Sequence, residues 1–170
     1  MIHPPRLSLA KETDLPDILN LQYLAYRSEA ELVGDPRIPP LLETLDDLKR
    51  QYETGTIICS MHDDAGLLIG SVRGTIRDKN LFIGKIMVHP RYQGQGYGKQ
   101  LLNYIEHKAP DTVVRFELFT SNLSKRNLSL YLSMGYSVFR EQAVAQRKWA
   151  FVFMEKIIPR AIIFPIREEP

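Results

Sequence analysis

The 170-residue sequence predicts a single domain of mixed α and β structure (α+β). Two observations lead to this class. Apolar residues recur at helical spacing between Leu15 and Tyr26 and again after Gly98, whereas shorter runs elsewhere have the alternating or continuously apolar pattern of strands. Turn-forming residues separate these runs, and the length suits one domain with a sizeable core. The predicted order of elements is β-α-α-β-β-β-α-β-α-β-β.

Local signals set the boundaries of these elements. Thr13 and Thr44 are predicted to cap the first two helices, because each hydroxyl precedes a helical run. The stretch Val33–Glu43 is rich in Pro and Gly and is predicted as a loop. Asp63–Gly66 and Arg77–Asn80 are typical turns between strands. In order, we expect strand 6–10, helix 11–32, helix 45–53, strands 56–62, 66–76 and 81–89, helix 98–106, strand 112–120, helix 124–134, and strands 136–144 and 149–158.

Residues 1–158 are predicted to form the domain, and residues 159–170 a C-terminal tail bounded by prolines. Within the tail, "AIIF" could pair with an edge strand, and together with the apolar last strands it would suit a homodimer. The oligomeric state stays open at this point.

Composition excludes several classes of function. A net charge of +2 without long runs of like charge argues against nucleic acid or an anionic membrane as partner. No apolar run approaches the roughly 20 residues of a membrane span, and the N-terminus lacks the apolar stretch of a signal peptide. Cys59 is the one cysteine and sits in an apolar run, so we expect a core residue in a reducing, cytoplasmic protein. No His, Cys and Asp cluster has metal-ligand spacing, so no metal is expected.

Three glycines at alternate positions, Gly94, Gly96 and Gly98, directly precede a helical run. Small residues allow consecutive amides to turn inward as a concave nest, and the helix start adds unpaired N–H groups and the positive end of its dipole. This pattern favours a phosphate or pyrophosphate ligand without a metal. The alternative is a tight turn that only lets strand and helix pack, but one glycine would suffice for that.

Two familiar nucleotide motifs do not fit the same stretch. The dinucleotide fingerprint G-x-G-x-x-G, started at Gly94, would need a third glycine where Lys99 stands. The P-loop pattern fails twice, because Gln93 replaces its first glycine and Gln100 replaces its Ser or Thr. A nucleotide-hydrolysing site is therefore not predicted.

The stretch "QGQGYG" (Gln93–Gly98) fits Gln/Arg-x-x-Gly-x-Gly/Ala, and the chain here resembles the GCN5-related N-acetyltransferase (GNAT) superfamily. The motif lies between the strand "IMVHP" and an amphipathic helix, as in that family. Downstream, Tyr131 and Gly135-Tyr136 resemble its second landmark. The likeness extends from Arg6 to Ile157. It implies a single-domain α/β fold with a mixed, mostly antiparallel sheet of 6–7 strands and about four helices.

The resemblance also implies how acetyl-CoA would be bound. The glycine-loop amides would hold the pyrophosphate, and the preceding strand would present backbone to the pantetheine arm. This requires the strands around Met87 and Leu118 to splay apart, helped by a β-bulge near Gly84 or Lys85. By similarity, the residues that contact the cofactor are Ile86, Met87, Val88, Gln93, Gly94, Gln95, Gly96, Tyr97, Gly98, Lys99, Asn122 and Asn127.

The reaction implied is direct attack of an amine on the thioester. Val88 N–H would stabilise the oxyanion, and Tyr131 would protonate the departing thiolate. The other interpretation of Tyr131 is a core aromatic, because it shares a helix face with Leu128 and Leu132. Relatives often carry an acid on the strand before the cofactor contacts, but this chain has Lys85 there.

The general base and the acceptor are the less determined parts. Glu117 is one candidate base, Glu29, Glu31 and Asp35 are others, and a chain without a dedicated base is a further option; His89 is expected to be structural. The acceptor could be a small amine, an amino acid, or a peptide or protein amine. The alternative functions are a catalytically silent CoA or acyl-CoA sensor and a purely structural interaction domain, which would leave the glycines unexplained.

Overall fold

The computed structural model describes residues 4–159, so the predicted tail from residue 160 onward, with its "AIIF" segment, lies outside the described part of the chain. The strands are β1 (Arg6–Leu9), β2 (Ile57–His62), β3 (Leu68–Arg77), β4 (Asn80–Val88), β5 (Arg115–Ser121), β6 (Ser137–Ala143) and β7 (Ala150–Ile157). The α-helices are α1 (Leu15–Val33), α2 (Pro39–Leu42), α3 (Leu45–Glu53), α4 (Tyr97–Lys108) and α5 (Lys125–Ser133).

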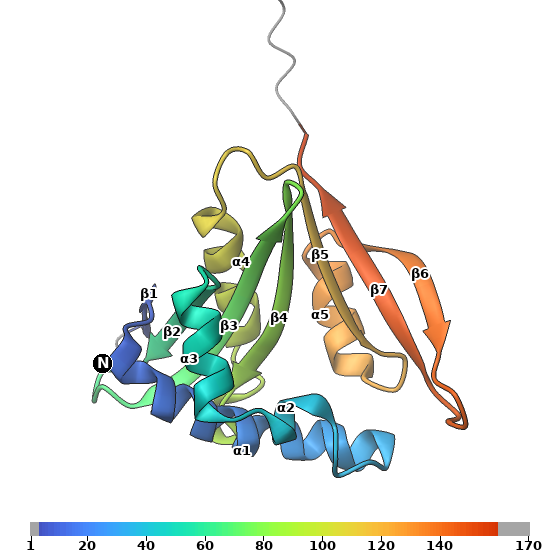
Figure 1. Cartoon of the computed structure of the whole chain (residues 1–170), viewed down its shortest axis with the longest axis horizontal. Helices are drawn as coiled ribbons and strands as arrows, with labels where there is room; N and C mark the ends of the chain where they lie inside the picture. The colour runs from blue at the N-terminus through green and yellow to red at the C-terminus, as the bar shows by residue number, and fades with distance from the viewer. Residues whose placement is uncertain (1–3, 160–170) are drawn as a thin grey trace, which may run out of the picture.

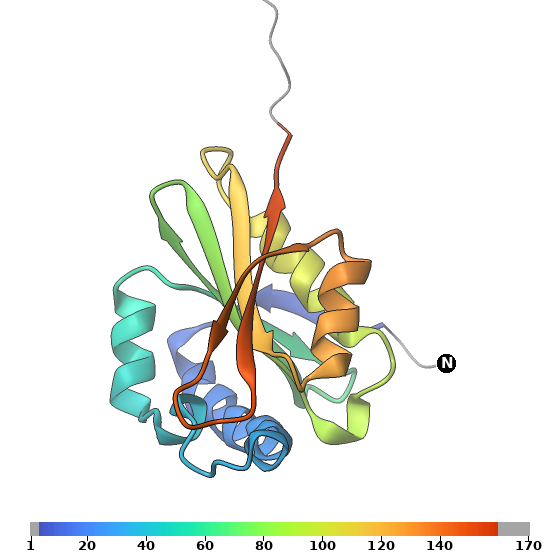
Figure 2. The same cartoon turned by 90° about the vertical axis from the view of Figure 1, so that its right-hand side faces the viewer.

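The strands form one seven-stranded sheet in the order β1-β2-β3-β4-β5-β7-β6. Every neighbouring pair is antiparallel except β4 with β5, which is parallel. Helices α1 and α3 lie on one face of the sheet, and α4 and α5 lie on the other, as Figures 1 and 2 show from two sides. The predicted fold class and the mostly antiparallel seven-stranded sheet are confirmed.

The parallel pair β4–β5 holds together at one end only. Its register joins Asn80–Phe82 to Arg115–Glu117, and the strands diverge beyond that point (Figure 1). A register shift between Ser71 and Arg73 of β3 faces a bulge in β4, where Lys85 has a φ of 51°. Such a bulge bends the strand and ends regular pairing. The expected splay and bulge are therefore both present.

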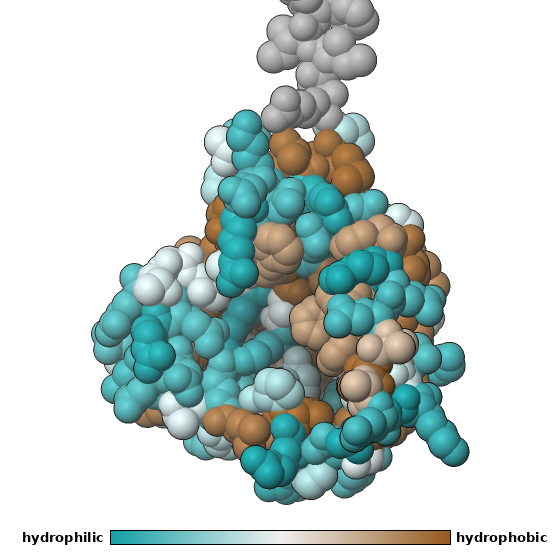
Figure 3. Space-filling model, turned by 45° about the vertical axis from the view of Figure 1, so that its right-hand side comes forward, coloured by the Kyte–Doolittle hydropathy of each residue, from teal (hydrophilic) through white to brown (hydrophobic). Residues whose placement is uncertain are grey.

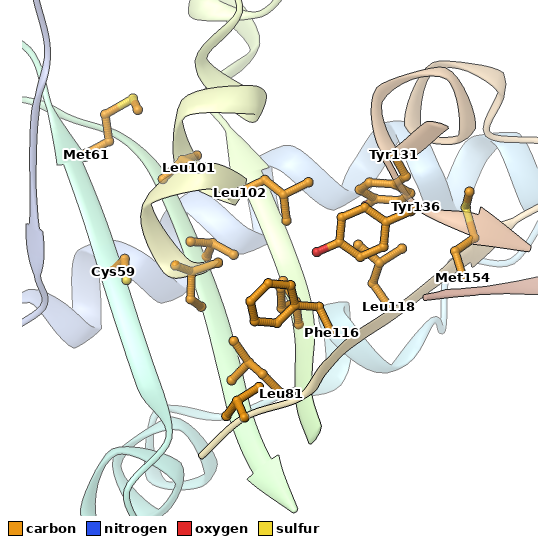
Figure 4. Packing of buried hydrophobic residues seen from close by; sticks show 14 of the residues in the cluster. Cys59, Met61, Leu81, Leu101, Leu102, Phe116, Leu118, Tyr131, Tyr136 and Met154 are labelled. Atoms are coloured by element: carbon orange, nitrogen blue, oxygen red, sulfur yellow. The ribbon is translucent and has the colours of Figure 1, made fainter. Parts of the chain in front are cut away.

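The core on the α4 face explains why α4 lies so close to the sheet. Leu101, Leu102 and Ile105 of α4 are fully buried in a cluster that also takes in Phe116 of β5 and Tyr136 (Figure 4). The close approach depends on two glycines of β3. A Cβ on Gly70 would lie 2.9 Å from Leu101 Cδ1, and one on Gly74 would lie 2.9 Å from Ile105 Cδ1.

Two local expectations were wrong, and each has a physical reason. Thr13 does not cap α1, because a 3₁₀ turn at Glu12–Asp14 comes first and Asp14 is the N-cap. Within the expected loop Val33–Glu43, residues Pro39–Leu42 form α2, since proline suits the first helical turn and Pro40 O accepts a hydrogen bond from Gln22 Nε2. Thr44 does cap α3 as predicted, in a reciprocal capping box with Asp47.

Candidate functional site

A cavity of about 870 Å³ opens where β4 and β5 diverge. Figure 3 shows the surface hollowed between the two halves of the sheet. Side chains and backbone from α1, β4, the glycine loop, β5, α5 and the β6–β7 loop line this cavity. Because β4 and β5 separate there, the cavity extends between the strands and is lined by both of them.

The glycine loop presents the start of α4 to the cavity. Gly94 and Gly96 have φ of 80° and 82°, a conformation that suits glycine, and Gly96 is the N-cap of α4. A Cβ on Gly98 would lie 3.3 Å from Leu130 Cδ2, so this glycine lets α4 approach α5. Of the loop residues predicted to bind the cofactor, Gln93, Gly94, Gly96, Tyr97, Gly98 and Lys99 line the cavity, and Gln95 is exposed elsewhere.

Gln93, the first residue of the motif, makes two side-chain hydrogen bonds that link neighbouring elements. Its Nε2 donates to Val88 O at 3.0 Å, and its Oε1 accepts from Arg126 of α5 at 2.6 Å. One side chain thus joins the end of β4 to α5 across the loop. Arg126 also lines the cavity, and it was not predicted, because a lone arginine on a short helix has no local signal.

Residues Ile86, Met87 and Val88, which the resemblance assigns to cofactor contact, line the cavity from β4. The Met87 side chain is only 1% exposed and packs with α1 residues, so β4 contributes mainly backbone here. No described strand pairs with β4 on its β5 side beyond Phe82. The backbone groups on that side are thus available to an extended ligand.

Tyr131 is both a core residue and a cavity residue. It is 6% exposed, packs near Tyr136 at 6.2 Å between ring centroids, and lines the cavity. Burial, together with the nearby Tyr26 and Glu29, raises the pKa of its hydroxyl above the ordinary value. The phenol therefore stays protonated at physiological pH, as a proton donor must.

Glu29 is the predicted acid that the structure brings nearest to this chemistry. It lines the cavity and accepts hydrogen bonds from Ser124 Oγ at 2.9 Å and Asn127 Nδ2 at 3.3 Å. Asn127, predicted to contact the cofactor, also lines the cavity and lies 3.4 Å from Thr120 Oγ1. Asp35 lines the cavity too, but forms an ion pair with Arg147 at 2.6 Å.

Other predicted residues lie away from the cavity. Glu117 is 3.3 Å from Arg115 at the closed end of the β4–β5 pair and does not line the cavity, so the predicted role as base is not supported. Asn122 accepts from Ala150 N and shapes the chain after β5 rather than the cavity wall. His89 accepts from Arg91 N and caps a turn, as expected for a structural residue. Glu31 is exposed outside the cavity.

Cys59 lies in the core, as predicted. The thiol is fully buried, and burial raises its pKa to about 12. A nucleophilic thiol must be accessible and readily ionised, and the Cys59 thiol is neither.

A buried polar network next to the cavity was not predicted from the sequence. The Glu43 carboxylate is 8% exposed and accepts from Gln22 at 2.7 Å, Gln51 at 2.6 Å, Arg73 at 2.8 Å and Lys85 at 2.5 Å. Burial opposes its ionisation, but the hydrogen bonds from Lys85 and Arg73 outweigh burial and lower its pKa to about 2. The network ties α1, α3, β3 and the β4 bulge together.

A seven-stranded sheet that parts beside a glycine loop at a helix start is the architecture that this chain shares with solved acetyltransferases. Residues 16–136 match the family described as the acetyltransferase (GNAT) family. This match covers well over half of the sequence, and the chain belongs to that family.

Further comparisons give one relative in sequence and several in structure. UPF0157 protein YqkA of Bacillus subtilis (strain 168) is 28% identical over 138 residues, which cover 81% of this chain and 38% of that protein, so the chain spans well under half of that relative. The ribosomal-protein-S18-alanine N-acetyltransferase of Escherichia coli matches with a TM-score of 0.75 and 16% identity over 93% of this chain and 96% of that one. The putative acetyltransferase yncA of Salmonella typhimurium, solved with its cofactor acetyl-CoA, gives a TM-score of 0.73 at 15% identity, over 94% of this chain and 96% of that one. At such identities the structures show the fold.

Residues 4–159 contain neither a membrane-spanning helix nor a metal-binding cluster of side chains. None of the helices there combines the length and apolar character of a membrane span. In the same residues, no group of three or more His, Cys, Asp or Glu side chains is placed to hold a metal ion.

Proposed function

We propose that this protein transfers the acetyl group of acetyl-CoA to a primary amine. The observation that carries the proposal is the joint presence of the glycine nest at the start of α4 and the unpaired side of β4 in one cavity. The nest suits a pyrophosphate, and the strand suits the amides of a pantetheine arm. Metal chemistry is not part of the proposal.

The donor would lie along the cavity wall made by β4 and the glycine loop. The backbone of Gly94–Lys99 would hold the pyrophosphate, and Lys99 and Arg126 line the cavity as cations that could pair with it. Ile86, Met87 and Val88 would pair with the pantetheine arm. Asn127 remains a proposed contact, whereas Gln95 and Asn122 do not line the cavity and are dropped from the proposed contacts.

The chain's own residues would act at three points of the transfer. The neutral amine attacks the thioester carbonyl, and the Val88 N–H donates to the developing oxyanion. The C–N bond forms, the C–S bond breaks, and Tyr131 gives its proton to the departing thiolate, to be reprotonated from solvent. Glu29, through water, is the proposed acceptor of the proton that the amine releases, since it lies in the cavity near Tyr131.

Calorimetry with CoA, followed by a thiol-release assay with acetyl-CoA and a panel of amines, tests the proposal. We expect CoA to bind and free thiol to appear with at least one class of amine. Tight CoA binding without thiol release for any amine would contradict a transferase and favour the sensor. Absence of CoA binding would contradict both.

A further inference from the structure

The sheet face opposite α5 carries a partly exposed row of aromatic rings. Along β5, Phe116 and Leu118 point into the core with α4, so Phe119 points to the other face, where it is 55% exposed. Its ring lies edge-on to Phe151 at 5.3 Å, and Phe151 lies edge-on to Trp149 at 5.0 Å. These three rings, called the aromatic wall below, all line the cavity.

The opposite side of the cavity is apolar as well. Ile38, Pro39 and Pro40, at the start of α2, line it together with Tyr26 of α1. The hydrogen bond from Gln22 Nε2 to Pro40 O, at 2.7 Å, fixes this segment to α1. The two sides form a groove on the α1 face of the sheet, away from the glycine loop.

The floor of this groove carries the ammonium of Lys85. Beneath it, Glu43 is paired with both Arg73 and Lys85, and the side chains of Arg73, Lys85 and Glu43 are 4%, 24% and 8% exposed. Lys85 lines the cavity, and Glu43 is its one hydrogen-bond partner among the described residues. An ammonium has three N–H donors, so the remaining donors of Lys85 can serve an anion.

The other charges of the groove are of both signs. Asp35 and Arg147 neutralise each other at the rim. Arg37 lines the cavity and forms no ion pair within residues 4–159. Glu29 accepts from Ser124 and Asn127 and also acts electrostatically on Tyr26, as Arg73 and Glu43 do. What would attract a carboxylate to the floor is therefore the N–H donors of Lys85 that Glu43 does not take up.

Building on the proposed function, we propose that the acceptor is an amino acid, or a similarly small primary amine, that bears both a carboxylate and an aromatic or large apolar group. The apolar group packs on the aromatic wall, and the carboxylate accepts from Lys85. The amine is thereby directed to the thioester between Val88 and Tyr131. Aromatic contacts and a charged hydrogen bond are the interactions that give such a pocket its selectivity.

The test uses matched amines with acetyl-CoA. Phenylalanine and 2-phenylethylamine differ by the carboxylate, phenylalanine and alanine differ by the ring, and spermidine serves as the polycation. We expect kcat/KM for phenylalanine to exceed that for each of the other three by about tenfold or more. Equal rates for all four, or a preference for spermidine, would overturn the inference and leave the transferase in place.

Two variants separate the two contacts. Lys85→Met should abolish the preference for phenylalanine over 2-phenylethylamine, and Lys85→Arg should keep part of it because the charge remains. Phe119→Ala should reduce the preference for phenylalanine over alanine. Phe139→Ala is the control, because Phe139 lies on the same sheet face near Phe153 but does not line the cavity. Equal effects of Phe119→Ala and Phe139→Ala would contradict the aromatic wall.

A readout independent of turnover comes from Trp149, the one tryptophan of the chain. Because Trp149 lines the groove, its emission should change in a saturable way with phenylalanine in the presence of CoA, and little with spermidine. If no amine releases thiol, the proposed function fails, and this titration still decides the groove's ligand. A flat response to phenylalanine would overturn the inference.

Discussion

The structural role of Glu43 follows from its hydrogen-bond partners. Four donors surround its carboxylate, and its folded pKa of about 2 lies below the ordinary 4.5. A lowered carboxyl pKa means that the folded state binds the proton less tightly than the unfolded state does. The stabilisation is therefore complete above about pH 4.5 and is lost as the pH falls towards 2.

Glu43→Gln should lower the free energy of unfolding at pH 7 by about 3 kcal/mol, because Arg73 and Lys85 lose their carboxylate. The difference from the wild type should shrink as the pH falls from about 4.5 to 2. Urea unfolding over this pH range measures it. Glu53→Gln, at the exposed end of α3, is the control and should change stability by less than about 0.5 kcal/mol. If the difference in free energy of unfolding between the wild type and Glu43→Gln did not change with pH, the lowered pKa could not be assigned to Glu43.

Gly96 offers a matched test of the glycine nest. Gly96 and Gly66 have φ of 82° and 83°, and a Cβ on either would meet nothing within 4 Å. Alanine at either position should cost about 1 kcal/mol of stability through its left-handed backbone. Only Gly96→Ala should also weaken CoA binding, by about tenfold or more, because its Cβ would enter the space proposed for the pyrophosphate. If calorimetry finds that both variants bind CoA as tightly as the wild type, the glycine loop is not the pyrophosphate site.

Tyr131→Phe should lower kcat about a hundredfold, the scale of a general acid, and leave acetyl-CoA affinity nearly unchanged. Because burial raises its pKa, no ionisation of Tyr131 should appear in the pH profile of the wild type up to about pH 10. Tyr104→Phe, on α4 and outside the cavity, is the control. If turnover is unchanged in Tyr131→Phe, Tyr131 is a packing residue of the core and not the proton donor.

Prediction from sequence succeeded at this scale where the signal is local. The glycine loop is a contiguous pattern whose conformation depends on its own residues, so Gly94 and Gly96 could be placed. Glu43, Arg73 and Lys85 are distant in sequence and meet only when α3 packs on the sheet, and none carries a motif. For Glu117, the strand could be assigned from the sequence, but its place along that strand, at the closed end beside Arg115, depends on register.

At the scale of elements, α4 and β3 are the pair that aligns the glycine loop with the sheet. Gly70→Ala should destabilise the fold by about 1–3 kcal/mol, because its Cβ would lie 2.9 Å from Leu101 Cδ1 and 3.2 Å from Met87 O. Gly84→Ala, also in a strand, meets nothing within 4 Å and is the control for stability. Thermal unfolding compares them, and equal midpoints would show that β3 has room to relax.

Element types could be predicted more fully than element ends. Period-two and helical patterns gave all seven strands and the helices α1, α3, α4 and α5, since each pattern reflects one buried face. Helix α2 was missed because Pro39 and Pro40 are typical of loops, and its single turn depends on a tertiary hydrogen bond from Gln22.

At the scale of the whole molecule, the glycine loop and the aromatic wall open on opposite faces of one sheet and meet where β4 leaves β5. The proposed direct transfer requires that donor and acceptor be bound together. Cys59, the one cysteine in the sequence, is fully buried and is no site for a covalent acetyl intermediate. Initial-rate plots against both substrates should intersect, and parallel lines would contradict direct transfer.

The short ladder between Asn80–Phe82 and Arg115–Glu117 also has a mechanical consequence. It is the one place where the β1–β4 part of the sheet hydrogen-bonds to the β5–β7–β6 part within the described residues. These three residue pairs are the whole ladder between the two parts, so packing in the shared core must supply the rest of their attachment. An extended ligand that paired with β4 beyond Phe82 would add backbone hydrogen bonds on its open side. The bound sheet would then be held by more hydrogen bonds than the free one.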